Sequence, residues 1–235
     1  MFLNGWTGTG IRVAVIDSGV HAAHPHVGGV AGAFGILDDG TLTDDYLDHL
    51  GHGTAVTAAI REKVPAAEIV AIKVFWRSLA TDVATLIRAI EEGSMRGAHV
   101  INLSLGTADR RHRDRLAAAV AAARDRGSIV VSATDDRGIE WLPGMLPDAI
   151  GVRAEWSGDR DGYAIAELGG RDVIAASPYP REIPGVPRDR NVHGVSFAVA
   201  NASAFVARAL EAAPTADIDA VFTTLRDAAC AVPIA

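Results

Sequence analysis

The sequence has 235 residues, of which 49% are hydrophobic and 22% charged, and its formal net charge is −7 at pH 7. This composition is that of an ordinary globular protein without an internal boundary, so we expect a single domain over residues 1–235. The acidic excess argues against sequence-independent binding to nucleic acid, which requires basic excess. The one basic run, at 109–115, opens an Ala-rich helical pattern and is interpreted as a solvated helix start.

The first ten residues, MFLNGWTGTG, lack a basic flank followed by an apolar run. We therefore expect no secretion signal, membrane span or prodomain. The single cysteine, Cys230, cannot form an internal disulfide, fits a reducing compartment and is expected to pack in the core. These features predict a cytoplasmic protein without membrane association.

Short apolar runs alternate with longer Ala-rich segments along the chain. The apolar runs predict buried strands at 11–16, 69–74, 99–105 and 128–133. The other segments predict helices at 52–63, 81–96, 109–126, 195–212 and 217–229, with Thr81-Asp82 as an N-cap and stops at Gly97 and Gly127. This alternation predicts an α/β fold with a doubly wound, mostly parallel sheet flanked by helices.

An irregular segment between Gly28 and Gly51 is rich in aspartate. Carboxylates so clustered could hold calcium, but their spacing matches no calcium-binding loop. We interpret the segment as a solvated surface loop and expect no metal; the aspartates are Asp38, Asp39, Asp44, Asp45 and Asp48.

Residues just after the strands are candidates for a site, because ligands of open parallel sheets bind beyond the carboxyl ends of the strands. The strands are followed by Asp17, by Ser104, Leu105 and Gly106, and by Asp135, while His52 and Ser196 open two helices. Each polar residue alone is typical of a cap or turn. Together they include the aspartate, histidine and serine that activate a hydroxyl nucleophile.

Four segments, VAVIDSGVHAAHP, GHGTAV, INLSLG and GVSFA, resemble those of the subtilisin-like serine peptidases (subtilases, peptidase family S8) in order and spacing. The resemblance covers about residues 5–210. It implies that Asp17 orients His52, that His52 is the general base and that Ser196 attacks the scissile carbonyl. It also implies an extended peptide substrate paired with the segment Ser104, Leu105 and Gly106, and no cofactor.

Two departures from the family pattern fall where subtilases stabilise the oxyanion. Asp135 aligns with their asparagine, and Val195 aligns with the threonine before the nucleophile. Losing one such donor typically costs ~10²–10³ in turnover, which predicts low activity. A protonated Asp135 could compensate as a donor, which would raise activity toward acidic pH, and His193 could also supply a donor.

Trp141 aligns near the floor of the first specificity pocket, where an indole would favour a small residue before the scissile bond; the alternative is that it covers the core. With the expected cytoplasmic location, these departures favour a narrow endopeptidase that trims a dedicated precursor peptide in natural-product maturation. The alternative is a weak or inactive relative that binds an extended peptide for a partner protein. Dinucleotide binding is dismissed because the glycines of GWTGTG precede the first strand, and the HAAHPH run lacks a second ligand set with zinc spacing.

Overall fold

The structure of the protein is a computed structural model that describes residues 3, 5–136, 138–215 and 217–230. The side chain of Cys230, which we expected in the core, lies outside the described part. No helix among the described residues is long and apolar enough to cross a membrane.

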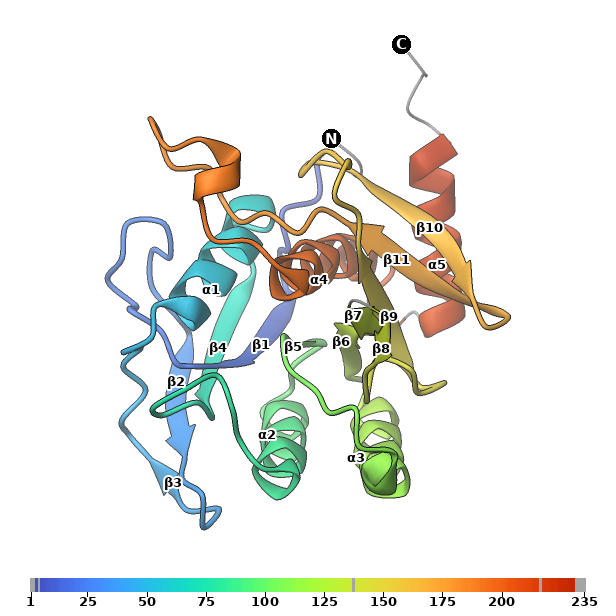
Figure 1. The fold of residues 1–235 in the computed structure, drawn as a ribbon. Coiled ribbons are helices and arrows are strands. Elements are labelled where there is room, and N and C mark those ends of the chain that lie inside the picture. Colours follow the sequence, from blue (N-terminus) through green and yellow to red (C-terminus); the bar gives the residue numbers. More distant parts are fainter. Residues whose placement is uncertain (1–2, 4, 137, 216, 231–235) are drawn as a thin grey trace.

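One nine-stranded sheet forms the centre of the fold (Figure 1). Its order is β10 (Tyr163–Leu168), β11 (Arg171–Ala176), β9 (Ala149–Ala154), β6 (Ile129–Ala133), β5 (Val100–Leu103), β1 (Arg12–Asp17), β4 (Glu68–Lys73), β2 (Gly32–Ile36) and β3 (Leu42–Thr43). All neighbours pair in parallel except the two edge pairs, β10 with β11 and β2 with β3. A separate two-stranded sheet joins β7 (Asp135–Asp136) to β8 (Ile139–Glu140).

Helices cover both faces of the sheet, as expected for strands that are buried on both sides. One face carries α1 (His52–Lys63) and α4 (Val195–Ala212), with α5 (Ile218–Cys230) beside α4, and the other carries α2 (Val83–Met95) and α3 (Arg113–Asp125) (Figure 1). The two apolar clusters that result lie on opposite sides of β1, since Val13 and Val15 belong to one and Ala14 and Ile16 to the other. The predicted mostly parallel α/β fold is confirmed.

Local signals in the sequence correspond well to the observed helix ends. Both α1 and α4 match their predicted ranges, and Asp82 caps α2 by accepting hydrogen bonds from the amides of Ala84 and Thr85 at 2.7 and 2.9 Å. The helix predicted at 109–126 begins as a short 3-10 turn, Arg110–His112, before α3. Beyond α2 and α3, Gly97 and Gly127 have positive φ angles of 71° and 84°, so these helices stop as predicted.

The aspartate-rich segment differs from the solvated loop that we predicted. It contains β2 and β3, and although Asp38, Asp39, Asp44 and Asp45 are exposed, Asp48 is only 2% exposed. A buried carboxylate requires compensating hydrogen bonds, and Asp48 obtains them from the chain on either side of His52. Within the described residues, no group of three or more His, Cys, Asp or Glu is arranged to hold a metal ion.

Candidate active site

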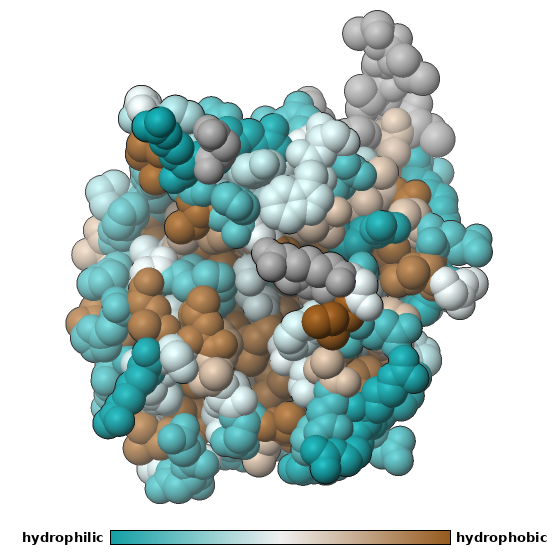
Figure 2. Space-filling model, in the orientation of Figure 1, coloured by the Kyte–Doolittle hydropathy of each residue, from teal (hydrophilic) through white to brown (hydrophobic). Residues whose placement is uncertain are grey.

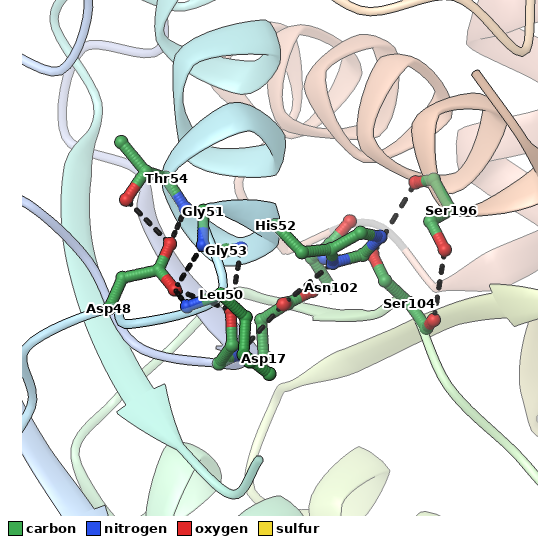
Figure 3. Close-up of polar contacts among 11 residues, drawn as sticks. Asp17, Asp48, Leu50, Gly51, His52, Gly53, Thr54, Asn102, Ser104 and Ser196 are labelled. Carbon is green, nitrogen blue, oxygen red and sulfur yellow. Dashed lines mark hydrogen bonds and ion pairs between the residues drawn. The ribbon is translucent and has the colours of Figure 1, made fainter. Parts of the chain in front are cut away.

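Asp17 and His52 meet where β1 ends and α1 begins. Nδ1 of His52 lies 2.7 Å from Oδ1 of Asp17, whose side chain is 1% exposed (Figure 3). The same carboxylate oxygen accepts a 2.7 Å hydrogen bond from the amide of Ser18. Because a carboxylate only accepts, Nδ1 carries the proton of a neutral imidazole and Nε2 keeps its lone pair. The pair thus holds His52 in the tautomer that suits a general base.

The environment of His52 changes its affinity for a proton. Burial lowers the pKa of His52, but the hydrogen bond and negative charge of Asp17, together with the charge of Asp48, outweigh it, so the pKa is raised above its ordinary value. A base of higher pKa binds the nucleophile's proton more strongly, yet it is protonated at a higher pH.

Asp48 fixes the start of the helix that carries His52. Its Oδ1 accepts hydrogen bonds from the amides of Leu50 and Gly51 at 3.0 and 2.8 Å. Its Oδ2 accepts from the amide and hydroxyl of Thr54 at 2.8 and 2.7 Å (Figure 3). Several amide and hydroxyl groups at this helix start are thus satisfied by one buried carboxylate.

Ser18 and Gly53 join the same helix start to the strand that carries Asp17. Oγ of Ser18 donates to Oδ1 of Asp48 at 2.9 Å and accepts from the amide of Gly53 at 2.9 Å. A Cβ atom on Gly53 would lie 2.2 Å from the carbonyl oxygen of Gly19, so only glycine permits this approach. The position of His52 relative to Asp17 is therefore set by two polar links and one close backbone contact.

Ser196 lies in the first turn of α4, beside the end of β5. Its Oγ donates to the carbonyl oxygen of Ser104 at 3.2 Å, and Oγ of Ser104 donates back to the carbonyl oxygen of Ser196 at 3.4 Å. The buried Asn102 supports this pair, since its amide donates to Oγ of Ser104 at 3.0 Å and its Oδ1 accepts from Ser203 at 3.0 Å. The serine is thus tied to the segment that follows β5.

The imidazole of His52 reaches this turn of α4, where its ring centre lies 5.6 Å from that of Phe197. Among the hydrogen bonds of the described residues, none joins His52 to Ser196. Hydrogen bonds between a base and its nucleophile are often loose until a substrate binds. The structure therefore brings His52 to the turn that carries the candidate nucleophile, with Ser196 Oγ directed to Ser104.

The predicted substrate edge and Trp141 lie together. Beyond Gly106, Thr107 and Leu142 exchange two 2.9 Å backbone hydrogen bonds. A Cβ atom on Gly106 would lie 3.5 Å from a ring carbon of Trp141, whose buried Nε1 has no hydrogen-bond partner among the described residues. Figure 2 shows hydrophobic surface around a hollow near the middle of this face, where Figure 1 places the carboxyl ends of the central strands.

The proposed oxyanion residues are less closely joined to Ser196. Oδ1 of Asp135 accepts a 3.0 Å hydrogen bond from Thr134, and no described interaction links its side chain to His52 or Ser196. Val195 is half-buried and packs against the apolar core. His193 contacts the rings of Trp156 and Tyr179 at the surface, each at 5.8 Å between ring centres.

Sequence reasoning missed Asp48 as a support of His52, and it missed Asn102 and Ser18. Asp48 precedes the predicted helix start by four positions, which is too far for the usual capping position, and four other aspartates lie nearby, so no local signal singled it out. Asn102 stands within an apolar strand, and a polar residue there indicates a buried hydrogen-bonding role.

Comparison with known proteins identifies the class. The model of the Subtilase family matches residues 8–158, and the chain therefore belongs to the subtilase family of serine peptidases. It is 28% identical over 205 residues to Subtilisin Savinase from Lederbergia lenta, an alignment covering 84% of this chain and 72% of that protein. An Alkaline protease from Shouchella clausii is also 28% identical, and there the chain spans 51% of the relative's length.

A solved structure supports the fold. The crystal structure of a cold adapted subtilisin-like serine proteinase superposes with a TM-score of 0.72 at 20% identity, covering 93% of this chain and 82% of that one. Likeness at this identity concerns the fold, and it agrees with the sheet order and helical layers described above.

Proposed function

We propose that the chain is a serine endopeptidase in which Asp17, His52 and Ser196 form the catalytic triad. The observation that carries the proposal is the 2.7 Å hydrogen bond between Asp17 and Nδ1 of His52, beside the helix turn that bears Ser196. In the proposed mechanism Oγ of Ser196 turns from Ser104 and attacks the peptide carbonyl while Nε2 of His52 takes its proton. Asp17 stabilises the resulting imidazolium, which then protonates the leaving amine.

The oxyanion in this proposal is stabilised by the start of α4. This helix has 18 residues and no side-chain cap at Gly194, so the amide of Ser196 in its first turn lies at the positive end of the helix dipole. Val195 offers no hydroxyl, and an ionised Asp135 would repel the developing charge. We therefore propose slow turnover that depends on good substrate positioning.

The proposed substrate is an extended peptide that pairs with Ser104, Leu105 and Gly106. Trp141, which lies against Gly106, would restrict the adjacent pocket and select a small residue before the scissile bond. Slow and selective cleavage suits a dedicated precursor peptide in natural-product maturation. The single cysteine supports a reducing compartment, for which we propose the cytoplasm.

The test is covalent labelling by a fluorophosphonate, followed by intact mass from pH 5 to 8, with Ser196→Ala as the control. We expect one adduct on the unaltered protein and none on the variant, with both proteins equally resistant to thermal unfolding. Absence of labelling throughout this range would instead favour a relative that binds a peptide for a partner protein without cleaving it. Rapid, unselective digestion of casein would contradict the narrow specificity.

A further inference from the structure

A pocket of about 300 Å³ lies beside the candidate site, on the outer side of α1. Its floor is Gly51, just before that helix, and a face of the helix formed by Thr54, Ala55 and Ala58. The loops that wall it carry His21, His24 and His26 on one side and Pro180, Arg181, Ile183, Asn191 and Val192 on the other. In Figure 3, Gly51 and Thr54 lie on the side of His52 away from Ser104 and Ser196.

The pocket lies where the part of a peptide substrate after the scissile bond would pass. In the proposed mechanism His52 gives its proton to the leaving amine, so the leaving peptide must begin within reach of the imidazole. The pocket begins at Gly51, next to His52, and its opposite wall includes Val192, four residues before Ser196. A peptide leaving past His52 therefore meets this pocket.

The charge of the pocket favours an anion. Arg181 and three histidines line it, and none of the described lining residues is a carboxylate. Among the described hydrogen bonds none is donated by the guanidinium of Arg181, and its ion pair with Glu62 is 3.7 Å long. Glu62 also pairs with Arg160 and lies 3.9 Å from Nζ of Lys63, so one carboxylate serves three cations.

Two histidines add hydrogen-bonding groups to the pocket. Nδ1 of His24 accepts the amide of His26 at 3.2 Å, so Nε2 of His24 is the nitrogen that carries a proton even in the neutral ring. Burial lowers the pKa of His26, as do the charges of Arg181 and His24, while Glu62 opposes them, so His26 adds hydrogen-bonding capacity to the pocket rather than positive charge. The apolar walls include the exposed Ile183 and Val192, which are 46% and 57% exposed.

We propose that this pocket binds an acidic side chain of the leaving peptide, with Arg181 as the specificity-determining residue. Glutamate fits this chemistry because its methylene groups can contact Ile183 and Val192 while its carboxylate accepts hydrogen bonds from a guanidinium, the side chain best suited to binding a carboxylate. The assignment to the leaving side rests on the proposed peptidase function, whereas the preference for an anion rests on the pocket alone.

The test uses a library of decapeptides in which each position in turn is Glu, Gln or Lys. Cleavage by the unaltered protein is followed by mass spectrometry, which gives relative kcat/KM and the cleaved bond. Retention of the same library on immobilised Ser196→Ala measures binding without catalysis. We expect at least a tenfold preference for Glu over Lys at one position after the cleaved bond and matching enrichment on the immobilised variant.

Arg181→Glu should reverse both preferences, whereas Arg190→Glu, an exposed arginine of the same loop outside the pocket, should leave them unchanged. Equal use of Glu and Lys at every position, or an unchanged preference in Arg181→Glu, would overturn the proposal. Enrichment of Glu without any cleavage would overturn the peptidase function but support the anion-binding pocket. Cleavage at the same rate whatever the charge of the peptide side chain would support the peptidase function and overturn the anion-binding pocket.

Discussion

Asp48 and Thr54 are joined by two hydrogen bonds to a single carboxylate oxygen, at 2.8 Å from the amide and 2.7 Å from the hydroxyl. Thr54 lies in the same first turn of α1 as His52, so these two hydrogen bonds hold the backbone that positions the imidazole. Asp17 therefore orients the ring of His52 directly, whereas Asp48 acts on it through the helix start.

Asp48→Asn should separate this positioning role from simple stability. The asparagine side chain can accept hydrogen bonds only at its oxygen. Its NH₂ group would therefore face N–H groups that now donate to one oxygen of the carboxylate, at a cost of about 1–3 kcal/mol in the free energy of unfolding. Since the charge of Asp48 raises the pKa of His52, that pKa should fall, as measured by the NMR titration of the imidazole. Asp44→Asn, an exposed neighbour, is the control; an unchanged pKa in Asp48→Asn would contradict the coupling.

Asp17→Asn should reduce kcat by about 10⁴-fold, because an amide at this position permits the wrong imidazole tautomer. The sign of the pH effect follows from the raised pKa of His52: catalysis needs the neutral ring and falls as pH decreases through that pKa. Removing the charge of Asp17 lowers the pKa, so the acid limb of kcat/KM should move to lower pH. The exposed Asp38→Asn should change neither quantity, and an unmoved limb in Asp17→Asn would argue against this source of the shift.

Gly53→Ala should push the start of α1 away from β1. The added methyl would lie 2.2 Å from the carbonyl oxygen of Gly19 and 3.1 Å from Cβ of Asp17, and neither neighbour is a flexible side-chain end. We expect a loss of about 1–3 kcal/mol in stability by urea unfolding and at least a tenfold loss in labelling rate. Gly32→Ala, where nothing lies within 4 Å of the new methyl, should behave as the unaltered protein. Full labelling activity in Gly53→Ala would show that the close approach is dispensable.

Asp135→Asn tests whether the residue aligned with the family's asparagine contributes to the oxyanion region. A neutral amide can donate a hydrogen bond where a carboxylate repels negative charge, so the labelling rate should rise about tenfold or more at pH 8. The control is Glu140→Gln on the facing strand of the small sheet, which removes an equal charge without supplying a donor at position 135. Identical rates in the two variants would remove Asp135 from the proposed mechanism.

Sequence patterns identified the central strands because β1, β4, β5 and β6 are apolar on both faces and cannot be mistaken for loops. The strands β2, β3, β9, β10 and β11 of the large sheet were not predicted: β2 contains two glycines, β9 includes Gly151 and Arg153, and β10 at the sheet edge is partly exposed. Their pairing is decided by contacts between distant segments, which no local pattern records.

Some parts of the candidate site could also be predicted from the sequence, and others could not. The sequence marks Asp17 at the end of a strand and His52 at the start of a helix, whereas the expectation that Asp17 orients His52 came from the resemblance to the subtilases. The burial of Asp48, the link through Ser18 and the pocket around Arg181 depend on loops that meet only in the folded chain. The catalytic roles themselves stay predictions that the variants above address.

The burial of Lys63, at the end of α1, leads to a prediction about the stability of the protein rather than its catalysis. The lysine side chain is fully buried. Within the part of the chain that the structure describes, its Nζ has no hydrogen-bond partner, and its two ion pairs with Glu62 and Asp161 are 3.9 and 3.7 Å long. Burial, followed by the charge of Arg160, lowers its pKa from 10.5 to about 8. Below pH 8 the lysine is charged in both folded and unfolded chains, so folding bears the whole cost of burying that charge.

Between about pH 8 and 10.5 the folded protein has lost this proton while the unfolded chain keeps it, so the contribution of Lys63 to stability improves as pH rises. Lys63→Met should therefore raise the free energy of unfolding at pH 7 by roughly 1–3 kcal/mol, and this gain should shrink toward pH 10. Lys73→Met is the matched control, because Nζ of that equally buried lysine donates to Asp45 at 3.1 Å and to the carbonyl of Leu47 at 2.8 Å. Its replacement should destabilise the fold, and a loss of stability in both variants would show that the buried Lys63 charge is compensated after all.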